Sequence, residues 1–445
     1  MINQGHARAG WASVDITPPL GLPMGGRGPR ISPGKELLDP LEAKVLWLED
    51  GHGGRQLWVS LDLVGLGARS SAQMRQDLAM QTGVDVEAIV LNFAHVHSGP
   101  MANSEKYASG APKPAGLRAY EAGLVERVVA AAVDAGRALR EVRVEAHRGD
   151  SHIGVNRRNR GESGEMEMRP NAEGLCNPDL WVLDLVSASG RAVLYSYGCH
   201  PVLVYGFAWN SLSADFVGVS RRHLAQGLEG ETHCQFLQGL AGNVRPRIVA
   251  DFESLTFRPA TPEDVVRAGT ELAEDVLGAL GKTGDELELR LKAAAGRVLL
   301  VQDRERIPSR EFWRKLSRSE DELDRHLGTY WGERMDRGLP PVEAALFEIG
   351  LLSLADGHDI AWMGGEPVAE WQEVLRRSLR DEDLTVWGYC QDVPCYLPTD
   401  ALLPEGGYEA VKSRFYNRDG PAPFRPGLDA EVSRQFQRLK KRLSY

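Results

Sequence analysis

Short apolar runs alternate with amphipathic segments along most of the chain. The runs at 44–48, 56–61 and 88–94 have the length and composition of strands. Apolar residues recur every three to four positions at 70–82 and 117–139, which is the period of an amphipathic helix. The other expected strands are 142–147, 181–186, 192–197, 233–237, 287–300, 345–354, 358–363 and 384–389, and the other expected helices are 217–227, 262–280, 311–337, 368–378 and 430–443.

Two hairpins are expected within this order. Ser-Gly and Asp-Gly turns separate the strand pairs 181–197 and 345–363, whereas strands and helices alternate elsewhere. This mixture predicts an α/β (α+β) fold of mixed β-sheets that pack together and are flanked by helices. We find no internal repeat and expect residues 1–445 to form one domain. The segment 160–173, rich in Gly, Glu and Asn, is expected to form a long loop near the functional site.

Composition excludes some classes of function. The chain has 445 residues and a net charge of -10, which argues against a nucleic-acid binder. No apolar run approaches the length of a membrane span, and the first residues lack the apolar stretch of a secretory signal. The five cysteines are an odd number in a long chain, so we expect reduced thiols and a cytoplasmic location.

The most informative segment is 95–99, His-Val-His-Ser-Gly, which ends the apolar run 88–94. Side chains two positions apart on a strand share a face, so His95 and His97 are expected to point the same way where that strand ends. Two such imidazoles suit a metal site with a proton carrier beside it. An ordinary pair of half-buried histidines is the alternative.

Two further segments end strands with possible metal ligands. His200 lies in Gly-Cys-His-Pro at 198–201, and Glu366 lies in Gly-Gly-Glu-Pro at 364–367, where Pro367 fits a first helical turn. Together with His95 they match a catalytic zinc site of two histidines and a carboxylate, which keeps one position open for water. Zinc lowers the pKa of that water from 15.7 to roughly 7. A histidine bonded to a carbonyl and a glutamate at a helix N-terminus are the alternatives.

Several short blocks resemble the catalytic domain of the neutral ceramidases, a family of zinc-dependent amide hydrolases. Tyr396 and Tyr408 are 12 residues apart, which is also the spacing in that family. The blocks occur in the family's order, and the resemblance covers nearly the whole chain. They are 12–18 (Ala-Ser-Val-Asp-Ile-Thr-Pro), 93–100 (Phe-Ala-His-Val-His-Ser-Gly-Pro), 155–157 (Val-Asn-Arg), 199–201 (Cys-His-Pro), 213–215 (Ser-Ala-Asp), 365–367 (Gly-Glu-Pro), 396–399 (Tyr-Leu-Pro-Thr) and 408–409 (Tyr-Glu).

The resemblance implies a role for each matched residue. His97 is the implied general acid or base, while Arg157 and Tyr408 are the implied donors to the carbonyl oxygen of the scissile bond. Arg158 and Arg160 are alternatives to Arg157. The implied ligands of Zn²⁺ are His95, His200, Glu366 and Tyr396. Asp15 and Asp62 are candidate supporting acids.

The chain also departs from the family. The family's Gly-Asp-Val-Ser-Pro-Asn is Gly-Asn-Val-Arg-Pro-Arg at 242–247, so attack by a serine at position 245 is not expected. Arg245 and Arg247 would instead bind an acidic substrate group or a neighbouring acid. We expect neither the C-terminal immunoglobulin-like domain nor the signal peptide of secreted ceramidases, and no amphipathic anchor is visible. The charged insertion 307–338 either roofs the pocket or forms a peripheral pair of helices.

These observations predict a zinc-dependent amidohydrolase that cleaves an N-acyl or similar amide bond of a small soluble substrate. No nucleic-acid partner and no stable membrane association are expected, and the sequence does not predict an oligomeric state. Three alternatives remain: an ester or lactone hydrolase or an amide-forming or cyclising enzyme on the same site, a true ceramidase, and a non-catalytic zinc-binding module.

Overall fold

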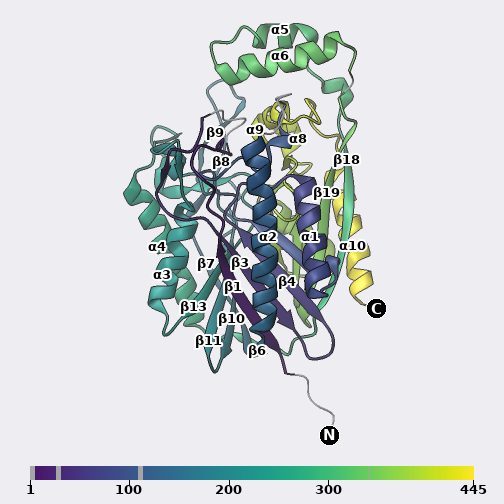
Figure 1. Cartoon of the computed structure of the whole chain (residues 1–445). Helices are drawn as coiled ribbons and strands as arrows, with labels where there is room; N and C mark the ends of the chain where they lie inside the picture. The colour runs from purple at the N-terminus through teal and green to yellow at the C-terminus, as the bar shows by residue number, and fades with distance from the viewer. Residues whose placement is uncertain (1–5, 27–31, 109–113, 340, 445) are drawn as a thin grey trace.

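The computed structural model describes residues 6–26, 32–108, 114–339 and 341–444. One mixed sheet from the N-terminal part of the chain has the strand order β5-β4-β3-β1-β6, and α1 (Ala68–Thr82) and α2 (Ala115–Arg137) cover its outer face (Figure 1). Leu78 of α1 and Leu124 of α2 pack with Val59 of the sheet in one core cluster. The strands are β1 (Arg8–Asp15), β3 (Glu42–Glu49), β4 (Arg55–Leu61), β5 (Ile89–Phe93) and β6 (Arg140–Glu141).

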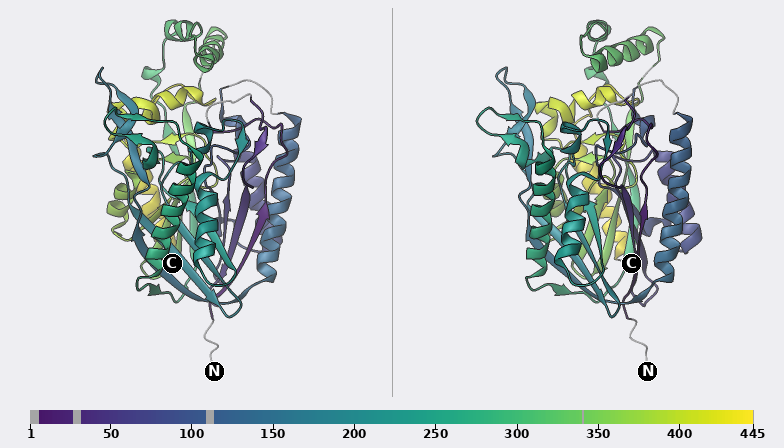
Figure 2. Two further views of the ribbon diagram at one scale, coloured as in Figure 1. Left: turned by 90° about the vertical axis from the view of Figure 1, so that its left-hand side faces the viewer. Right: turned by 60° about the vertical axis from the view of Figure 1, so that its left-hand side comes forward.

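A second sheet faces the first and has the order β13-β11-β10-β7-β17 (Figure 2). Its outer face is covered by α3 (Asp215–Gly227) and α4 (Pro262–Leu280), where Tyr195, Phe216 and Leu272 lie in one core cluster. The strands are β7 (Arg143–Asp150), β10 (Asp179–Ser187), β11 (Gly190–Tyr197), β13 (Thr232–Gln238) and β17 (Asp285–Glu286).

A third sheet, of order β18-β19-β20-β22, lies against the other two, with α7 (Trp371–Leu379) and α10 (Leu428–Leu443) on its outer side. Its strands are β18 (Lys292–Val301), β19 (Ala344–Ala355), β20 (His358–Met363) and β22 (Thr385–Trp387). The three sheets meet in a central core to which each contributes a tryptophan. The Trp58 ring centroid lies 5.1 Å from that of Trp387 and 6.4 Å from that of Trp181.

Each sheet contains one parallel pair at its inner end. These pairs are β4 with β5, β11 with β13, and β20 with β22. The segments that follow β5, β11 and β20 carry His95, His200 and Glu366, and the three meet at one end of the molecule. The fold therefore builds its candidate site from one strand end of each sheet, where loops are free to carry polar groups.

The predicted fold class, mixed sheets flanked by helices, is confirmed, and most expected elements are present within a few residues. The loop expected at 160–173 is wrong, because β8 (Gly154–Arg160) and β9 (Met166–Asn171) form a hairpin. Asn159 and Asn171 donate side-chain hydrogen bonds to backbone carbonyls across that hairpin. Polar residues thus stabilise strands that an apolar pattern does not reveal.

Other boundaries also differ. The strand expected through 94 ends at Phe93, and Pro367 lies in the two-residue strand β21 (Glu366–Pro367) instead of a helix, since α7 begins at Trp371. The expected strand 287–300 is ordered as β18 only from Lys292. The helical segment 311–337 divides into α5 (Arg310–Leu316) and α6 (Glu322–Asp336), which project beyond the rest of the fold (Figure 1). No helix in the described part of the chain is long and apolar enough to cross a membrane.

The start of α4 yields a stability prediction. The Asp264 amide donates to Thr261 Oγ1 at 3.4 Å, and the Thr261 amide donates to Asp264 Oδ2 at 2.8 Å, which completes a capping box. We expect Thr261→Ala to lower the free energy of unfolding by about 1 kcal/mol, measured by urea denaturation. Thr256→Ala, at an exposed threonine, is the control. Equal stability of the two variants would contradict a capping role.

Candidate functional site

Three buried histidines meet beyond the ends of β5 and β11. Ligand nitrogens of His95, His97 and His200 all lie within 4.8 Å of one another. His95 has φ 65°, a left-handed conformation that is uncommon for a residue with a side chain. Its amide donates to the Leu63 carbonyl at 3.0 Å, which holds this turn in place. The two histidines of the His-Val-His segment therefore reach one site through a turn and not along a common strand face.

Backbone carbonyls fix the orientation of two imidazoles. Nδ1 of His95 lies 2.7 Å from the Val64 carbonyl oxygen, and Nδ1 of His200 lies 2.5 Å from that of Ala241. Because a carbonyl only accepts, each Nδ1 carries the proton and each Nε2 is turned inward. Burial lowers the pKa of His200 to about 4, and the charge of Arg157 acts in the same direction. His200 is therefore neutral near pH 7, with a lone pair on Nε2.

Glu366 brings a carboxylate to these nitrogens. Its Oε2 lies 3.2 Å from His95 Nε2 and 3.8 Å from His200 Nε2. Its Oε1 accepts a hydrogen bond from Lys106 Nζ at 3.1 Å. Burial alone raises the pKa of Glu366, but Lys106 and His95 outweigh it and hold the pKa well below its usual range. The carboxylate is therefore ionised, and its two oxygens face different partners.

Tyr396 stands beside Glu366 because β21 pairs in parallel with β23 (Tyr396–Leu397), with Glu366 opposite Tyr396. The Tyr396 hydroxyl oxygen lies 3.4 Å from His200 Nε2 and accepts from Arg157 Nη2 at 3.0 Å. Burial raises the pKa of Tyr396 well above its ordinary value, although Arg157 opposes that shift. The phenol therefore keeps its proton without a cation, and coordination by this oxygen would release it.

These donors fit a divalent cation such as zinc. The imidazole nitrogens of His95 and His200 and an oxygen of Glu366 converge from three sheets, and Tyr396 adds a fourth donor. Nitrogen and carboxylate ligands of this kind are those that zinc takes in proteins. A lone pair of His200 facing an ionised carboxylate is unfavourable unless a proton or cation lies between them.

Arg157, which donates to Tyr396, belongs to a network of buried charged side chains. Arg157 Nε donates to Glu409 Oε1 at 2.8 Å, and Arg158 Nη1 donates to Glu409 Oε2 at 2.7 Å. These three side chains are at most 5% exposed. Burial raises the pKa of Glu409, but Arg157 and Arg158 outweigh it and lower the pKa below its ordinary value. Arg157 is thus fixed between a carboxylate and Tyr396.

A cavity of about 30 Å³ opens beside the histidines and is lined mainly by polar side chains. The His97 ring centroid lies 5.6 Å from that of His200 and faces this space. The Tyr408 ring lies 5.4 Å from that of Tyr396, and the Arg157 guanidinium carbon lies 5.6 Å from the Tyr408 ring centroid. The lining residues are Gly26, Val64, His95, His97, Lys106, Tyr107, Glu366, Cys395, Tyr396, Tyr408, Ser413, Tyr416 and Asn417.

The structure thus brings the four predicted ligands together with His97, Arg157 and Tyr408 into one neighbourhood, and it adds three residues that the sequence reasoning missed. Lys106 lies in the loop after the His-Val-His segment and bonds Glu366, while Glu409 follows Tyr408 directly and bonds Arg157. Glu409 belongs to the Tyr-Glu block at 408–409, which gave a signal for its position but not for its contact, whereas no sequence signal was found for Lys106. Tyr389 packs its ring 4.3 Å from that of His95, and its buried hydroxyl has no hydrogen-bond partner among the described residues.

The candidate supporting acids Asp62 and Asp15 bond an arginine and a backbone amide, respectively. Asp62 pairs with Arg221 at 2.7 Å, and Asp15 accepts from the Thr17 amide at 2.7 Å. Asp215, from the Ser-Ala-Asp segment, accepts from the Leu203 and Val204 amides at 2.9 Å. Asp215 therefore anchors the loop that follows His200.

The two additional arginines lie away from the cavity lining. The Arg245 guanidinium carbon lies 4.5 Å from the Phe257 ring centroid, which is a cation–π distance. The Arg247 amide donates to the Ile153 carbonyl at 2.7 Å. Binding of an acidic substrate group by these residues remains a prediction.

The pair α5–α6 packs at the site end of the molecule (Figure 1). Trp331 Nε1 donates to the Phe415 carbonyl at 2.8 Å, and His326 Nε2 lies 3.0 Å from the Ala108 carbonyl oxygen. Phe415 precedes Tyr416, which lines the cavity. The insertion therefore contacts the segment that forms one wall of the cavity.

Two other places in the fold are weaker candidates. Glu145, His147 and Asp184 form a second group with metal-ligand spacing, but Arg191 pairs with Asp184 at 2.7 Å and Arg143 pairs with Glu145. These positive charges oppose a cation there.

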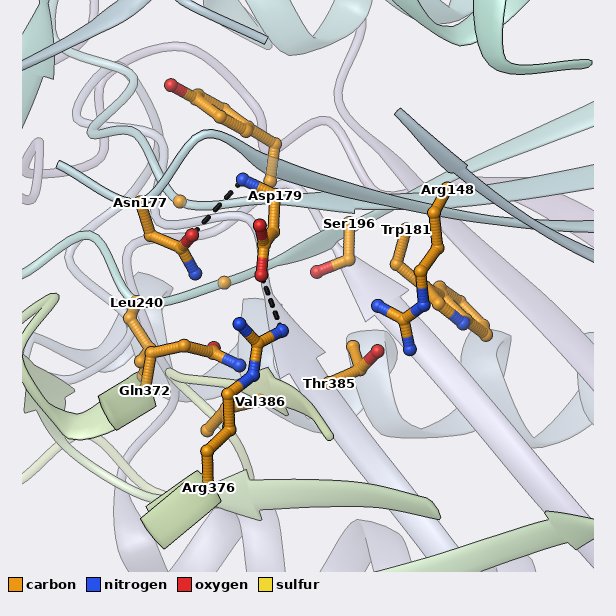
Figure 3. Close-up of a pocket in the computed structure, with 13 residues that line it drawn as sticks. Arg148, Asn177, Asp179, Trp181, Ser196, Leu240, Gln372, Arg376, Thr385 and Val386 are labelled. Carbon is orange, nitrogen blue, oxygen red and sulfur yellow. Dashed lines mark hydrogen bonds and ion pairs between the residues drawn. The ribbon is translucent and has the colours of Figure 1, made fainter. Parts of the chain in front are cut away.

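A second cavity, of about 20 Å³, lies between β10, β11 and β22 (Figure 3). Arg376 Nη2 donates to Asp179 across it at 2.5 Å, and Arg148 donates to the Asp383 carbonyl nearby. Its charged groups are thus bonded within the protein, and its lining includes no histidine or cysteine.

Comparison with known proteins identifies structures of the same fold. No protein-family model and no curated protein sequence matches the chain. Solved structures do match it, and two of them each cover 99% of this chain at 16% sequence identity. One is neutral ceramidase from Pseudomonas aeruginosa, with a TM-score of 0.71 over 75% of that chain, and the other is a ceramidase complexed with C2, with a TM-score of 0.69 over 76% of that chain. The protein therefore has a neutral ceramidase-like α/β fold, as the sequence resemblance predicted.

Proposed function

We propose that this protein is a zinc-dependent amidohydrolase that cleaves an N-acyl or similar amide bond of a small soluble substrate. The observation that carries the proposal is the convergence of His95 Nε2, His200 Nε2 and Glu366 Oε2 beside Tyr396, at the edge of a cavity. The ceramidase-like fold supports an amide as the bond that is cleaved.

His95, His200, Glu366 and Tyr396 would hold the zinc ion. When bound, zinc polarises a carbonyl and acidifies a water molecule so that hydroxide is available near neutral pH. His97 lies beside the ligands and would accept the proton of the attacking water and pass it to the leaving amine. Tyr408, on the cavity wall, and Arg157, behind Tyr396, would stabilise the negative charge that develops on the carbonyl oxygen.

The cavity lining favours a polar substrate. Lys106, Tyr408, Ser413 and Asn417 are among its lining residues. A ceramide carries long apolar chains, which side chains of this polarity do not match. True ceramidase activity is therefore the second candidate, and the likeness to ceramidase structures is the observation that favours it. An ester or lactone, or amide formation and ring closure, would use the same site.

Compartment and partners form part of the proposal. All five cysteines are free thiols, and four of them are buried, which supports a reducing compartment such as the cytoplasm. We propose that the chain acts as a single catalytic domain on a small molecule, without a nucleic-acid partner or stable membrane association. A purely structural zinc module would need only its ligands, so the presence of His97 and Tyr408 on the cavity argues against that alternative.

The proposal is tested by metal analysis and a substrate panel on the purified chain. We expect one zinc ion per chain, loss of amide hydrolysis on chelation and recovery on adding zinc. The panel compares short N-acyl amides, matched esters and lactones, and a ceramide in detergent. A chain that binds no zinc, or that hydrolyses amides equally well after complete chelation, would overturn the proposal.

A histidine variant separates proton transfer from metal binding. His97→Gln is expected to lower kcat about 10²–10⁴-fold, because positioned acid–base groups contribute about that factor. Its zinc content should equal that of the parent, since His97 is proposed to carry protons and not to hold the ion. Steady-state kinetics and metal analysis measure both quantities. Loss of zinc together with activity would reassign His97 as a ligand.

A further inference from the structure

A buried amide network contacts the segments that carry His95 and His200. Gln238, the last residue of β13, and Asn92, in β5, are both 0% exposed. The Gln238 amide donates to Asn92 Oδ1 at 2.8 Å, and Asn92 Nδ2 donates to the Gln238 carbonyl at 3.1 Å. Asn92 Nδ2 also donates to the Gly388 carbonyl at 2.9 Å, in the segment after β22. One side chain thus joins the ends of all three sheets.

The side chain of Gln238 reaches the two histidine segments themselves. Its Nε2 donates to the Ala94 carbonyl at 2.9 Å and to the Cys199 carbonyl at 2.9 Å. Its Oε1 accepts from the Cys199 amide at 3.3 Å. Both partners of Nε2 are carbonyls, which only accept, so the orientation of the amide is fixed by its contacts.

The two carbonyl groups that Gln238 contacts directly precede two of the proposed metal ligands. The Ala94 carbonyl belongs to the peptide group that leads into His95, and the Cys199 carbonyl belongs to the one that leads into His200. A single planar amide group therefore bridges the backbones that carry two proposed ligands from different sheets. Groups behind metal ligands commonly set ligand orientation and metal affinity.

We propose that Gln238 is a positioning residue that sets the separation of His95 and His200 and thereby the affinity of the site for zinc. This inference depends on the proposed zinc site. It does not require Gln238 to contact the metal or the substrate. The spacing of the two imidazoles is held from behind by one amide, while their own Nδ1 contacts fix only how each ring is turned.

The chain offers a matched control. Gln235 lies on the same strand, is also 0% exposed, and donates from Nε2 to the Trp58 carbonyl at 3.3 Å in the core. Gln238→Met and Gln235→Met therefore remove the same buried amide at similar volume, but only the first lies behind the histidines. The length of the Gln238 side chain is tested separately by Gln238→Asn, which keeps the amide group but shortens the side chain by one methylene.

The experiment titrates each metal-free variant with zinc against a chromophoric chelator, with no substrate present. We expect the zinc dissociation constant of Gln238→Met to rise about 10–100-fold, the range seen when outer contacts of metal ligands are removed. Gln235→Met should stay within about twofold of the parent. The visible absorption of the cobalt-substituted protein should change with Gln238→Met and Gln238→Asn, and should not change with Gln235→Met.

The outcomes are distinguishable from failure of the proposed function. Parent-like zinc affinity in Gln238→Met, or an equal loss in both methionine variants, would overturn the positioning role while leaving the zinc site intact. If Gln238→Met does not fold, parent-like affinity and cobalt absorption in Gln238→Asn would likewise overturn it. If Gln238→Met weakens zinc binding but the parent protein hydrolyses no amide, the positioning role of Gln238 would be supported and the proposed amidohydrolase activity would be rejected.

Discussion

Glu366→Gln is expected to remove zinc from the protein and to reduce amide hydrolysis to background. The substitution keeps the shape of the side chain but removes the negative charge that faces His95 Nε2 at 3.2 Å and His200 Nε2 at 3.8 Å. A neutral amide is a poor zinc ligand, and it leaves the Lys106 ammonium, whose side chain is only 13% exposed, without its carboxylate partner. The loss of zinc affinity should exceed the roughly 10–100-fold typical of residues behind the ligands.

Metal analysis after dialysis, chelator competition and activity on a short N-acyl amide measure this effect. Glu370→Gln is the matched control, because Glu370 follows closely in the chain and contacts Asn243 Nδ2 at 2.9 Å instead of the histidines. The control should retain one zinc ion per chain. Retention of parent-like zinc affinity in Glu366→Gln would show that Glu366 is not a ligand.

The second large effect is expected on stability. Glu409→Leu should lower the free energy of unfolding by about 3–5 kcal/mol, because removing one partner of a buried ion pair leaves uncompensated charge. Arg157 and Arg158 are 4% and 5% exposed, and both donate to this carboxylate. Urea denaturation measures the change. The control is Asp134→Asn, which breaks the ion pair between Asp134 and Arg137. These two side chains are 65% and 76% exposed, so the free energy of unfolding is expected to fall by less than about 1 kcal/mol.

The same variant has a pH signature. The pKa of Glu409 in the folded protein is lowered from its ordinary value of 4.5, since Arg157 and Arg158 outweigh the effect of burial. A carboxylate with a lowered folded pKa contributes stability that is fully present above its unfolded pKa and is lost as pH falls through its folded pKa. The stability difference between parent and Glu409→Leu should therefore shrink below about pH 4.5. A difference that is constant with pH would show that the effect is one of packing.

Much of the fold was predictable from local patterns. Apolar runs and amphipathic periods identified β4, β5, β10, β11 and most helices, because burial on one face imposes a period on the sequence. The hairpin of β8 and β9 escaped prediction, since it is stabilised by asparagine side chains and a buried arginine cluster. The turn at His95 escaped for a similar reason, because contacts with Leu63 and Val64 hold its left-handed backbone.

The sequence by itself determined the segments that carry His95, His200 and Glu366, because each follows an apolar strand and contains glycine or proline. Tyr396 was indicated only by the resemblance to the neutral ceramidases. Only the tertiary structure decided that these residues meet and what surrounds them. Lys106 reaches Glu366, Glu409 reaches Arg157, and Gln238 bridges Ala94 and Cys199 across distances in the chain that no local pattern records. Local periodicity reports which face of an element is buried, whereas partners between elements are set by how three sheets pack together.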